Sequence, residues 1–433
     1  MVKDNLTSEF CFKNLSKDKV KKYLHQIKTK KATGYDNIPP KLAQMCSDEL
    51  STAFTGMIND CFVNNIFPDD MKRAEIVPLF KKCNDMEKNN YRPVSILTTF
   101  DKVFETVIAE QLIEHFNSLF CKMLCAYRKK HGCEHILVNL MEKWKWSLDN
   151  DEYVGTILMD LSNAFDCMPH KLLICKLRAY GVSENACIFL STYLSNRYQR
   201  VKINNHRSTW KPVKKGIPQG SCLGPLLFNI FINDIFCFIS KCDLINYADD
   251  NTLSFGARTL ELVVSALKED TEIAIKWFTD NFMKVNPEKF QMMLMKPSLC
   301  RTELPTSLEI NSVPIERQSS VKLLGIVIDE NLRFDKQVSN MCGRASKQLK
   351  VIFRFKSLFK ETEKKIIFST FIMSNFNYCP IVWHFCGATQ MRKMEKIQER
   401  ALRFVFCDFK SDYLELLEKS NCDIFKKNQS HSL

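Results

Sequence analysis

The stretch Asn246-Tyr247-Ala248-Asp249-Asp250-Asn251-Thr252-Leu253 places two adjacent carboxylates between apolar segments. Asp and Asn side chains hydrogen-bond their own backbone in turns, so this pattern predicts a β-hairpin with Asp249 and Asp250 at its tip. Adjacent carboxylates repel each other. If a third carboxylate lies nearby, the natural occupant is a pair of hard divalent cations, which prefer oxygen ligands and organise phosphoryl transfer. A solvated Asp-Asp turn has the same local sequence, so the neighbouring motifs decide between the two interpretations.

A candidate third carboxylate follows an apolar segment earlier in the chain. Residues 154–160 read Val-Gly-Thr-Ile-Leu-Met-Asp, which is typical of a buried strand that ends in a carboxylate, and residues 161–170 then turn into a helix. We therefore expect the strand to present Asp160 as a metal ligand. The alternative is a helix N-cap, which is the commoner use of Asp at such a place.

A loop rich in glycine and proline lies between these two motifs. Residues 216–225 read Gly-Ile-Pro-Gln-Gly-Ser-Cys-Leu-Gly-Pro, and an apolar helix is predicted to follow. Glycines at this density let a nucleotide or template base approach the backbone closely. The side-chain amide of Gln219 offers both a donor and an acceptor to a base or sugar edge.

Three cationic side chains are candidates for contacts with phosphate. A predicted hairpin would carry Lys81 and Arg92 on one side, where they could grip a triphosphate because each supplies charge and hydrogen-bond donors. Lys289, before a predicted strand, could donate a proton to a pyrophosphate leaving group. Ordinary surface charge explains Lys81 and Arg92 equally simply, and it is the commoner explanation for a lysine such as Lys289.

Composition and charge describe a globular chain with a basic C-terminal part. The 433 residues, 45% hydrophobic and 26% charged, predict about two to four domains or subdomains. The formal charge of +13 favours polyanionic partners such as nucleic acid. From Arg333 onwards there are 19 Lys/Arg and 10 Asp/Glu, a net charge of +9, and we expect a duplex to be held there.

The 19 cysteines are scattered through predicted helices and strands without a signal peptide, so we interpret them as reduced thiols. The spacing of Cys121, Cys125, His131, Cys133 and His135 matches no common zinc pattern. No apolar run approaches the roughly 20 residues of a membrane span, so we expect a soluble intracellular protein, in the nucleus or the cytoplasm.

Apolar periodicity predicts the remaining elements. Helices are expected at residues 42–64, 101–116, 134–148, 170–197, 226–239 and 259–281, with basic helical stretches at 336–360, 361–376 and 391–406. Strands are expected at 291–295 and at 321–329, the second with Gly325 at its centre, where another backbone can come near.

Four blocks, taken in order, resemble the reverse transcriptases of non-LTR (LINE-class, jockey-like) retrotransposons. The resemblance covers roughly residues 20 to 410 and is carried by Tyr91-Arg92-Pro93-Val94-Ser95-Ile96-Leu97, Met159-Asp160-Leu161-Ser162-Asn163-Ala164-Phe165-Asp166, the loop 216–225, and Tyr247-Ala248-Asp249-Asp250. It implies an α+β, right-hand polymerase fold with an antiparallel-sheet palm. The corresponding regions are an N-terminal finger extension (1–70), fingers (71–150), palm (151–330) and a helical, basic thumb (331–433).

The resemblance also implies a reaction, partners and roles for single residues. The reaction is RNA-directed DNA synthesis from dNTPs on an RNA template and a DNA primer, with two Mg²⁺ ions, or Mn²⁺ in their place, and without a membrane. The implied catalytic and metal-binding residues are Asp160, Asp249 and Asp250; the implied nucleotide-binding residues are Lys81, Arg92, Phe165, Gln219 and Lys289; and those near the template or primer are Gly220, Tyr247 and Gly325. Phe165 would lie against the sugar 2′ position and favour dNTPs over rNTPs by steric exclusion.

The chain also departs from the family pattern. Cys222 stands where valine is more frequent, Asn163 where lysine often occurs, and Cys83 where glycine is common. The chain begins at the expected fingers without an endonuclease domain, so we expect a partial open reading frame. Two other functions stay open: an inactive relic that only binds RNA through its basic thumb, and an RNA-dependent RNA polymerase, against which Phe165 argues. The sequence does not indicate an oligomeric state.

Overall fold

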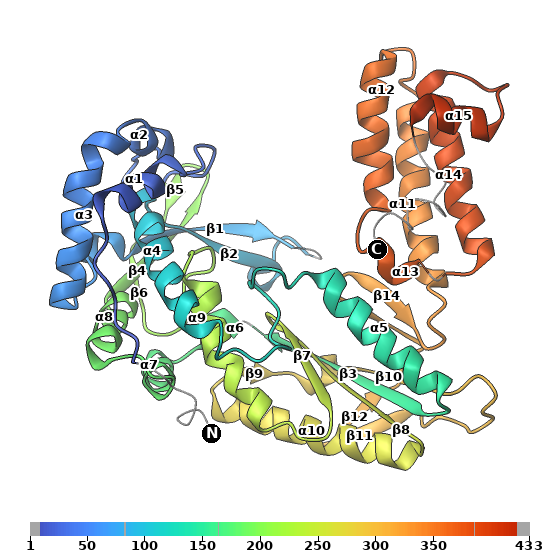
Figure 1. The fold of residues 1–433 in the computed structure, drawn as a ribbon, viewed down its shortest axis with the longest axis horizontal. Helices are drawn as coiled ribbons and strands as arrows, with labels where there is room; N and C mark the ends of the chain where they lie inside the picture. Colours follow the sequence, from blue (N-terminus) through green and yellow to red (C-terminus); the bar gives the residue numbers. More distant parts are fainter. Residues whose placement is uncertain (1–8, 82–83, 163, 385, 422–433) are drawn as a thin grey trace.

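A computed structural model describes residues 9–81, 84–162, 164–384 and 386–421. Figure 1 shows a row of elements along the molecule, with the N-terminal helices at one end, a central sheet, and the last helices gathered at the other end. The fold mixes helices and sheets, as the sequence predicts. None of the described helices is long and apolar enough to cross a bilayer.

The central sheet is antiparallel and carries the paired aspartates. Its strand order is β10-β3-β8-β7, and the short β9 pairs with the end of β3. The strands are β3 (Tyr153–Ser162), β7 (Asp243–Tyr247), β8 (Asp250–Ala257), β9 (Lys284–Val285) and β10 (Gln291–Met295).

Two helices cover opposite faces of this sheet, α5 (Cys133–Asp149) and α10 (Leu260–Asp280). Gly155 faces α10 so closely that a Cβ there would lie 2.5 Å from a methyl carbon of Leu267. On the other face, Trp144 of α5 donates its indole N–H to the Ser254 hydroxyl at 2.6 Å. The sheet therefore separates two hydrophobic cores, one on each face.

A second sheet joins two distant segments of the chain. Its order is β2-β1-β4-β5, with β6 also paired to β4, and the pairing of β1 with β4 is parallel while the others are antiparallel. The strands are β1 (Arg73–Phe80), β2 (Tyr91–Ile96), β4 (Arg197–Ile203), β5 (His206–Arg207) and β6 (Lys211–Val213). The stretch from β4 to β6 thus belongs to a sheet with residues more than a hundred positions earlier.

The helices of the first half pack around an aromatic core that includes Phe62, Phe104 and Phe189. The Ser16 hydroxyl caps the first helix by accepting the N–H of Lys19. These helices are α1 (Lys17–His25), α2 (Pro40–Met45), α3 (Ser47–Asn64), α4 (Thr99–Phe116), α6 (Ala164–Cys167), α7 (His170–Ala179), α8 (Glu184–Leu194) and α9 (Gly224–Ile232). Short 3₁₀ turns occupy Asp69–Met71, Lys88–Asn90, Asn233–Cys237 and Pro287–Lys289.

Two small hairpins lead from the central sheet to a helical C-terminal region. The hairpins are β11 (Ser307–Ile310) with β12 (Val313–Glu316), and β13 (Ser320–Leu323) with β14 (Ile326–Asp329). The helices that follow are α11 (Asp335–Phe353), α12 (Glu361–Ile367), α13 (Pro380–Trp383), α14 (Ala388–Phe406) and α15 (Tyr413–Ser420), with a π-helical turn at Phe368–Ile372 and a 3₁₀ turn at Met373–Asn375.

Several predicted helices are interrupted. The predicted helix 42–64 breaks at Cys46 into α2 and α3, and the predicted helix 170–197 ends at Ala179 and resumes at Glu184. Gly181 explains the second break because its φ of 81° is a left-handed conformation that commonly ends a helix. The predicted helical stretches 226–239 and 361–376 likewise continue as 3₁₀ or π turns rather than as α-helix.

The predicted single strand 321–329 is wrong. Leu324 and Gly325 both have positive φ, 45° and 90°, which makes a two-residue reversal between β13 and β14. Gly325 therefore marks a hairpin turn rather than the middle of a strand.

Candidate active site

The predicted Asp-Asp hairpin is present. β7 and β8 pair in register from Asp243 with Ser254 to Tyr247 with Asp250, which leaves Ala248 and Asp249 as a two-residue turn. Ala248 has a φ of 58°, an uncommon conformation for a residue with a Cβ. The turn is therefore slightly strained and depends on its surroundings to hold it.

Two buried asparagines hold this turn. Asn246 donates its side-chain amide to the Ala248 carbonyl at 2.8 Å and to the Asn251 side-chain oxygen at 2.9 Å, and Asn251 donates to the Asp249 carbonyl at 3.2 Å. The backbone of Asn246 also pairs with residues 123–125. The sequence analysis expected Asn side chains to bond their own backbone at this turn, but it did not predict the bond between the two asparagines or the pairing with residues 123–125.

Asp160 lies directly opposite Asp250, because β3 and β8 pair antiparallel with these two residues in register. The strand continues to Ser162, so Asp160 lies within it rather than at its end, and the alternative of a helix N-cap is wrong. Both carboxylates line a cleft of about 890 Å³.

Loss of solvation and the negative charge of neighbouring carboxylates shift the pKa of a carboxyl group in the cleft. Loss of solvation, followed by the charges of Asp249 and Asp160, raises the pKa of Asp250 to about 6. Carboxylate oxygens are the ligands that Mg²⁺ prefers, so the donor set fits a divalent cation that would relieve this repulsion. Within the described ranges, however, no three Asp, Glu, His or Cys side chains converge closely enough to form a complete set of metal ligands.

The glycine-rich loop packs between β2 and the segment that follows β3. The Gly216 N–H donates to Met168 at 2.8 Å, and a Cβ at Gly216 would lie 2.8 Å from the backbone of Asp166. On the other side, the Ser95 N–H donates to the Gln219 carbonyl at 2.7 Å, and Gly220 adopts a φ of 112°. Glycine is needed at 216 and 220 because both positions combine positive φ with close backbone contacts.

Gln219 contacts a carboxylate that sequence reasoning did not single out. Its side-chain amide donates to both oxygens of Asp166, at 3.0 Å each. Burial raises the pKa of Asp166, while the Gln219 hydrogen bond and the Lys81 charge act in the opposite direction. The charge of Lys81 thus acts on Asp166, which contacts the glycine-rich loop through Gln219. Asp166 is the last residue of the motif 159–166, and this position was the one sign in the sequence that it could belong to the site.

A buried carboxylate of α4 also holds the loop from behind. Glu105 accepts the Cys222 backbone N–H at 2.6 Å and the Tyr193 hydroxyl at 2.5 Å. Nothing in the sequence pattern of α4 distinguishes Glu105 from a surface residue, so only the structure reveals this contact.

Phe165 is half-buried between two other rings. It stacks on Phe228 of α9 with a centroid distance of 4.7 Å, and Tyr127 meets it edge-on at 6.4 Å. Burial and the charge of Asp249 raise the pKa of Tyr127, whereas the charge of Arg92 lowers it. Tyr127, another residue that sequence reasoning missed, therefore lies within electrostatic range of both the hairpin tip and the basic strand.

The predicted basic hairpin is formed by β1 and β2. Arg92 pairs with Leu79, and the Lys81 N–H donates to Asn90 at 2.8 Å just beyond the strand. Side chains alternate along a strand, so Lys81 and Arg92 lie on the same face, as predicted. Lys289 lines the cleft together with Asp160.

The remaining predicted residues lie around the same region. A hydrogen bond with Cys133, followed by burial, raises the pKa of Tyr247 to about 12. Gly325 packs against the ring of Tyr378, whose hydroxyl donates to the Leu324 carbonyl at 2.6 Å. No contact in the structure tests a template or primer role for Gly220, Tyr247 or Gly325, so these roles stay predictions.

The fold and the cleft together define an α+β protein in which a two-aspartate hairpin faces a third aspartate across a sheet, beside a glycine-rich loop and a basic hairpin. The chain belongs to the reverse transcriptase (RNA-dependent DNA polymerase) family, whose model matches residues 80–328.

The chain is also similar in sequence to individual proteins named as RNA-directed DNA polymerases. The chain is 25% identical over 406 residues to a probable RNA-directed DNA polymerase from transposon BS of Drosophila melanogaster, covering 88% of this chain and 43% of the relative. It is 24% identical over 334 residues to the RNA-directed DNA polymerase from mobile element jockey of the same organism, covering 75% of this chain and 36% of the relative. The chain thus spans less than half the length of these relatives.

Among solved structures, the chain is similar to an apo telomerase from Candida tropicalis truncated from its C-terminal domain. The TM-score is 0.43 at 12% identity, and the match covers 70% of this chain and 62% of that chain.

Proposed function

We propose that this chain is an RNA-directed DNA polymerase that adds dNTPs to a primer 3′-hydroxyl on an RNA template. The observation that carries the proposal is the register of the central sheet, which sets Asp160 opposite Asp250 in one cleft and puts Asp249 at the adjoining turn. Membership of the reverse transcriptase family supports it.

The proposed architecture is that of a right hand. The N-terminal 150 residues would form the finger extension and fingers, residues 151–330 the palm, and residues 331–433 a helical thumb. Because β4 to β6 pair with β1, we propose that this stretch acts with the fingers, as an insertion into the palm segment.

Asp160, Asp249 and Asp250 would hold two Mg²⁺ ions. When bound, these ions lower the pKa of the primer hydroxyl and stabilise the charge on the departing pyrophosphate. Lys289 lines the same cleft, where it would donate a proton to the leaving group.

The side chains around the cleft would bind and orient the nucleotide. Lys81 and Arg92, on one face of the basic hairpin, would bind the triphosphate. Gln219, held by Asp166, would lie beside the nascent base pair. Phe165 is fixed by its stacking on Phe228 and would exclude a sugar 2′-hydroxyl.

Primer extension on a homopolymeric RNA template with Mg²⁺ and dNTPs tests this function. Wild type should extend the primer, and the double substitution Asp249→Ala, Asp250→Ala should abolish extension. Asp243→Ala is the matched control, because Asp243 lies at the other end of β7 in an exposed ion pair with Lys143 at 3.0 Å. A folded wild-type protein that binds RNA but extends no primer would overturn the proposal.

A further inference from the structure

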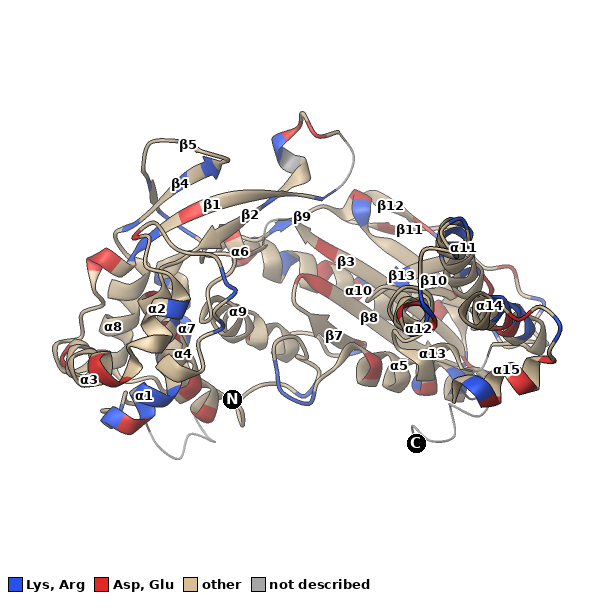
Figure 2. Ribbon diagram, turned by 90° about the horizontal axis from the view of Figure 1, so that it is seen from above, with Lys and Arg blue, Asp and Glu red and all other residues tan. Residues whose placement is uncertain are grey.

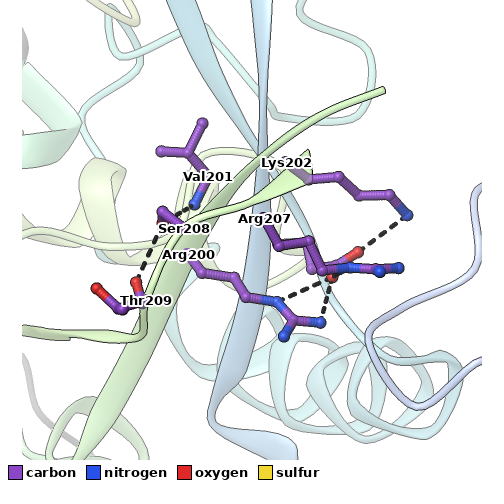
Figure 3. A network of polar contacts seen from close by, with 7 residues as sticks. Arg200, Val201, Lys202, Arg207, Ser208 and Thr209 are labelled. Atoms are coloured by element: carbon purple, nitrogen blue, oxygen red, sulfur yellow. Dashed lines mark hydrogen bonds and ion pairs between the residues drawn. The ribbon is translucent and has the colours of Figure 1, made fainter. Parts of the chain in front are cut away.

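A buried carboxylate in the second sheet holds three cationic side chains together. Glu75 of β1 has a side chain that is 1% exposed. Arg200 donates to one of its oxygens through Nε at 3.0 Å and Nη2 at 2.5 Å, Arg207 donates to the same oxygen at 2.9 Å, and the Lys202 ammonium lies 3.1 Å from the other. Figure 3 shows the three cationic side chains on one side of the strands, with Val201 pointing away.

The cluster carries excess positive charge. Three cations around one carboxylate leave two charges unbalanced, and residues 197–215 contain seven Lys/Arg and no Asp or Glu. Figure 2 shows these blue segments on β4 and β5 beside a red one on β1. Like charges at this density normally repel, but here Glu75 holds them in fixed positions. The cluster therefore presents a preformed site for an anion.

The strand register places this cluster on the face that carries Arg92. Arg92 pairs with Leu79, and Glu75 pairs with Arg200. Positions 75 and 79 are an even number of residues apart on β1, so their side chains share one face of the sheet. Four residues of strand correspond to about 13 Å. The basic cluster is thus a continuation of the face that we propose binds the nucleotide triphosphate.

Aromatic rings border the cluster. The guanidinium of Arg200 lies 4.5 Å from the ring centroid of Trp210, and that of Arg73 lies 5.9 Å from the rings of both Trp210 and Tyr35. The two rings meet edge-on at 5.7 Å. Proteins that bind single-stranded nucleic acid combine a basic track with aromatic side chains in this way.

We infer that Arg200, Lys202 and Arg207 bind phosphates of the single-stranded RNA template ahead of the point of synthesis. The inference rests on the proposed polymerase function, which supplies the template. At about 3.4 Å per stacked nucleotide, 13 Å corresponds to about four nucleotides beyond the incoming nucleotide. A template with a shorter overhang would not reach the cluster.

Binding to primer–template duplexes without dNTPs tests the inference separately from catalysis. One duplex has a single unpaired template nucleotide, and the other has about eight. The double substitution Lys202→Ala, Arg207→Ala should weaken binding of the long overhang about tenfold and reduce the slope of log K against log salt by about 0.7 for each lost phosphate contact. Binding of the short overhang should stay unchanged.

The matched control is Lys211→Ala, Lys214→Ala. Lys211 pairs with Gln199, which lies on the opposite face of β4 from Arg200, and Lys214 follows the end of β6. The variant therefore removes the same charge from two lysines outside the ion pairs of Glu75 with Arg200, Lys202 and Arg207. The variant Lys202→Arg, Arg207→Lys keeps the charges and should retain tight binding. Melting curves establish that each variant is folded.

Three results would overturn the inference. If the Lys202→Ala, Arg207→Ala variant binds both duplexes equally more weakly, the cluster contacts the duplex rather than the overhang. If the control variant loses as much affinity for the long overhang, the effect is one of net charge alone. If the variant binds the long overhang as tightly as the wild type, the cluster does not contact the template. Primer extension across the single-nucleotide overhang reports catalysis in the same preparations. Failure of the polymerase function therefore shows as lost extension, whereas failure of the inference shows only in the overhang dependence.

Discussion

The cleft at the Asp-Asp hairpin and the cluster around Glu75 are both formed by strand pairing, but they carry charge of opposite sign. In the cleft, strand pairing sets Asp250 opposite Asp160, and the neighbouring carboxylates help to raise the pKa of Asp250. In the cluster, strand pairing sets Glu75 opposite Arg200; burial alone would raise the pKa of Glu75, but hydrogen bonds from three cations outweigh it and lower that pKa.

This difference shows how a sheet can prepare two kinds of binding site. Neighbouring carboxylates repel one another, and a bound metal ion relieves that repulsion. A carboxylate with an excess of cations is itself satisfied and leaves positive charge for a phosphate. Substitutions at the two sites should therefore have different consequences, which can be ranked.

The largest effect is expected on catalysis at the cleft. Asp160→Asn keeps the shape of the side chain but removes a metal ligand, and we expect extension on a short-overhang template to fall at least about 10³-fold. Glu75→Gln should change the same rate less than about threefold, because Glu75 lies away from the reacting atoms. Single-turnover kinetics measure both. Comparable losses in the two variants would remove the functional distinction between the sites.

The next effect is expected on stability at the cluster. Glu75→Gln leaves three cations without their carboxylate, and we expect a loss of about 2 kcal/mol at pH 7, below the cost at a fully buried site because the cations are partly exposed. The folded pKa of Glu75 is lowered, so its stabilisation is present above the ordinary value of 4.5 and is lost as the pH falls through the folded pKa.

Chemical denaturation at neutral pH and at about pH 3 compares the wild type with this variant. The difference in the free energy of unfolding should shrink at the acidic pH. A difference that stays constant across this range would show that the carboxylate charge is not what stabilises the cluster.

A smaller effect is expected on sugar selectivity beside the cleft. Phe165→Ala should reduce the preference for dNTPs over rNTPs about tenfold, because the ring would no longer exclude the 2′-hydroxyl. The ratio of kcat/KM for the two nucleotides measures it, with Phe165→Tyr as the variant that keeps the ring. An unchanged dNTP preference would count against the steric role of Phe165.

The smallest effect is expected on stability at the cleft, and its sign is opposite to that at the cluster. Because the folded pKa of Asp250 is raised from 3.8 to about 6, its contribution is full below pH 3.8 and is lost as the pH rises through 6. In the presence of a chelator, Asp250→Asn should raise stability above pH 6 by about 1 kcal/mol, a value discounted for solvent screening at this exposed side chain.

Melting of Asp250→Asn and wild type between pH 4 and 8, about the window of the shift, measures this gain. The gain should vanish towards pH 4, where the wild-type carboxyl is already protonated. Destabilisation at neutral pH would contradict the repulsion that we assign to the cleft.

The sequence by itself determined the local elements of this protein. Turn residues between apolar segments predicted the hairpin of Asp249 and Asp250, an apolar run predicted β3, and glycine and proline predicted the loop at 216–225. These signals are local, because backbone conformation and side-chain alternation depend on residues a few positions apart. The chain reversal at Leu324 and Gly325 was not predicted, because the apolar pattern continues on both sides of it.

Only the tertiary structure decided which segments meet. The register that opposes Asp160 to Asp250, the pairing of β1 with β4 that gathers three cations on Glu75, and the hold of Glu105 on Cys222 each join residues far apart in the chain. Such contacts depend on how buried faces pack together and on which strand edges remain available for pairing. No local pattern contains that information.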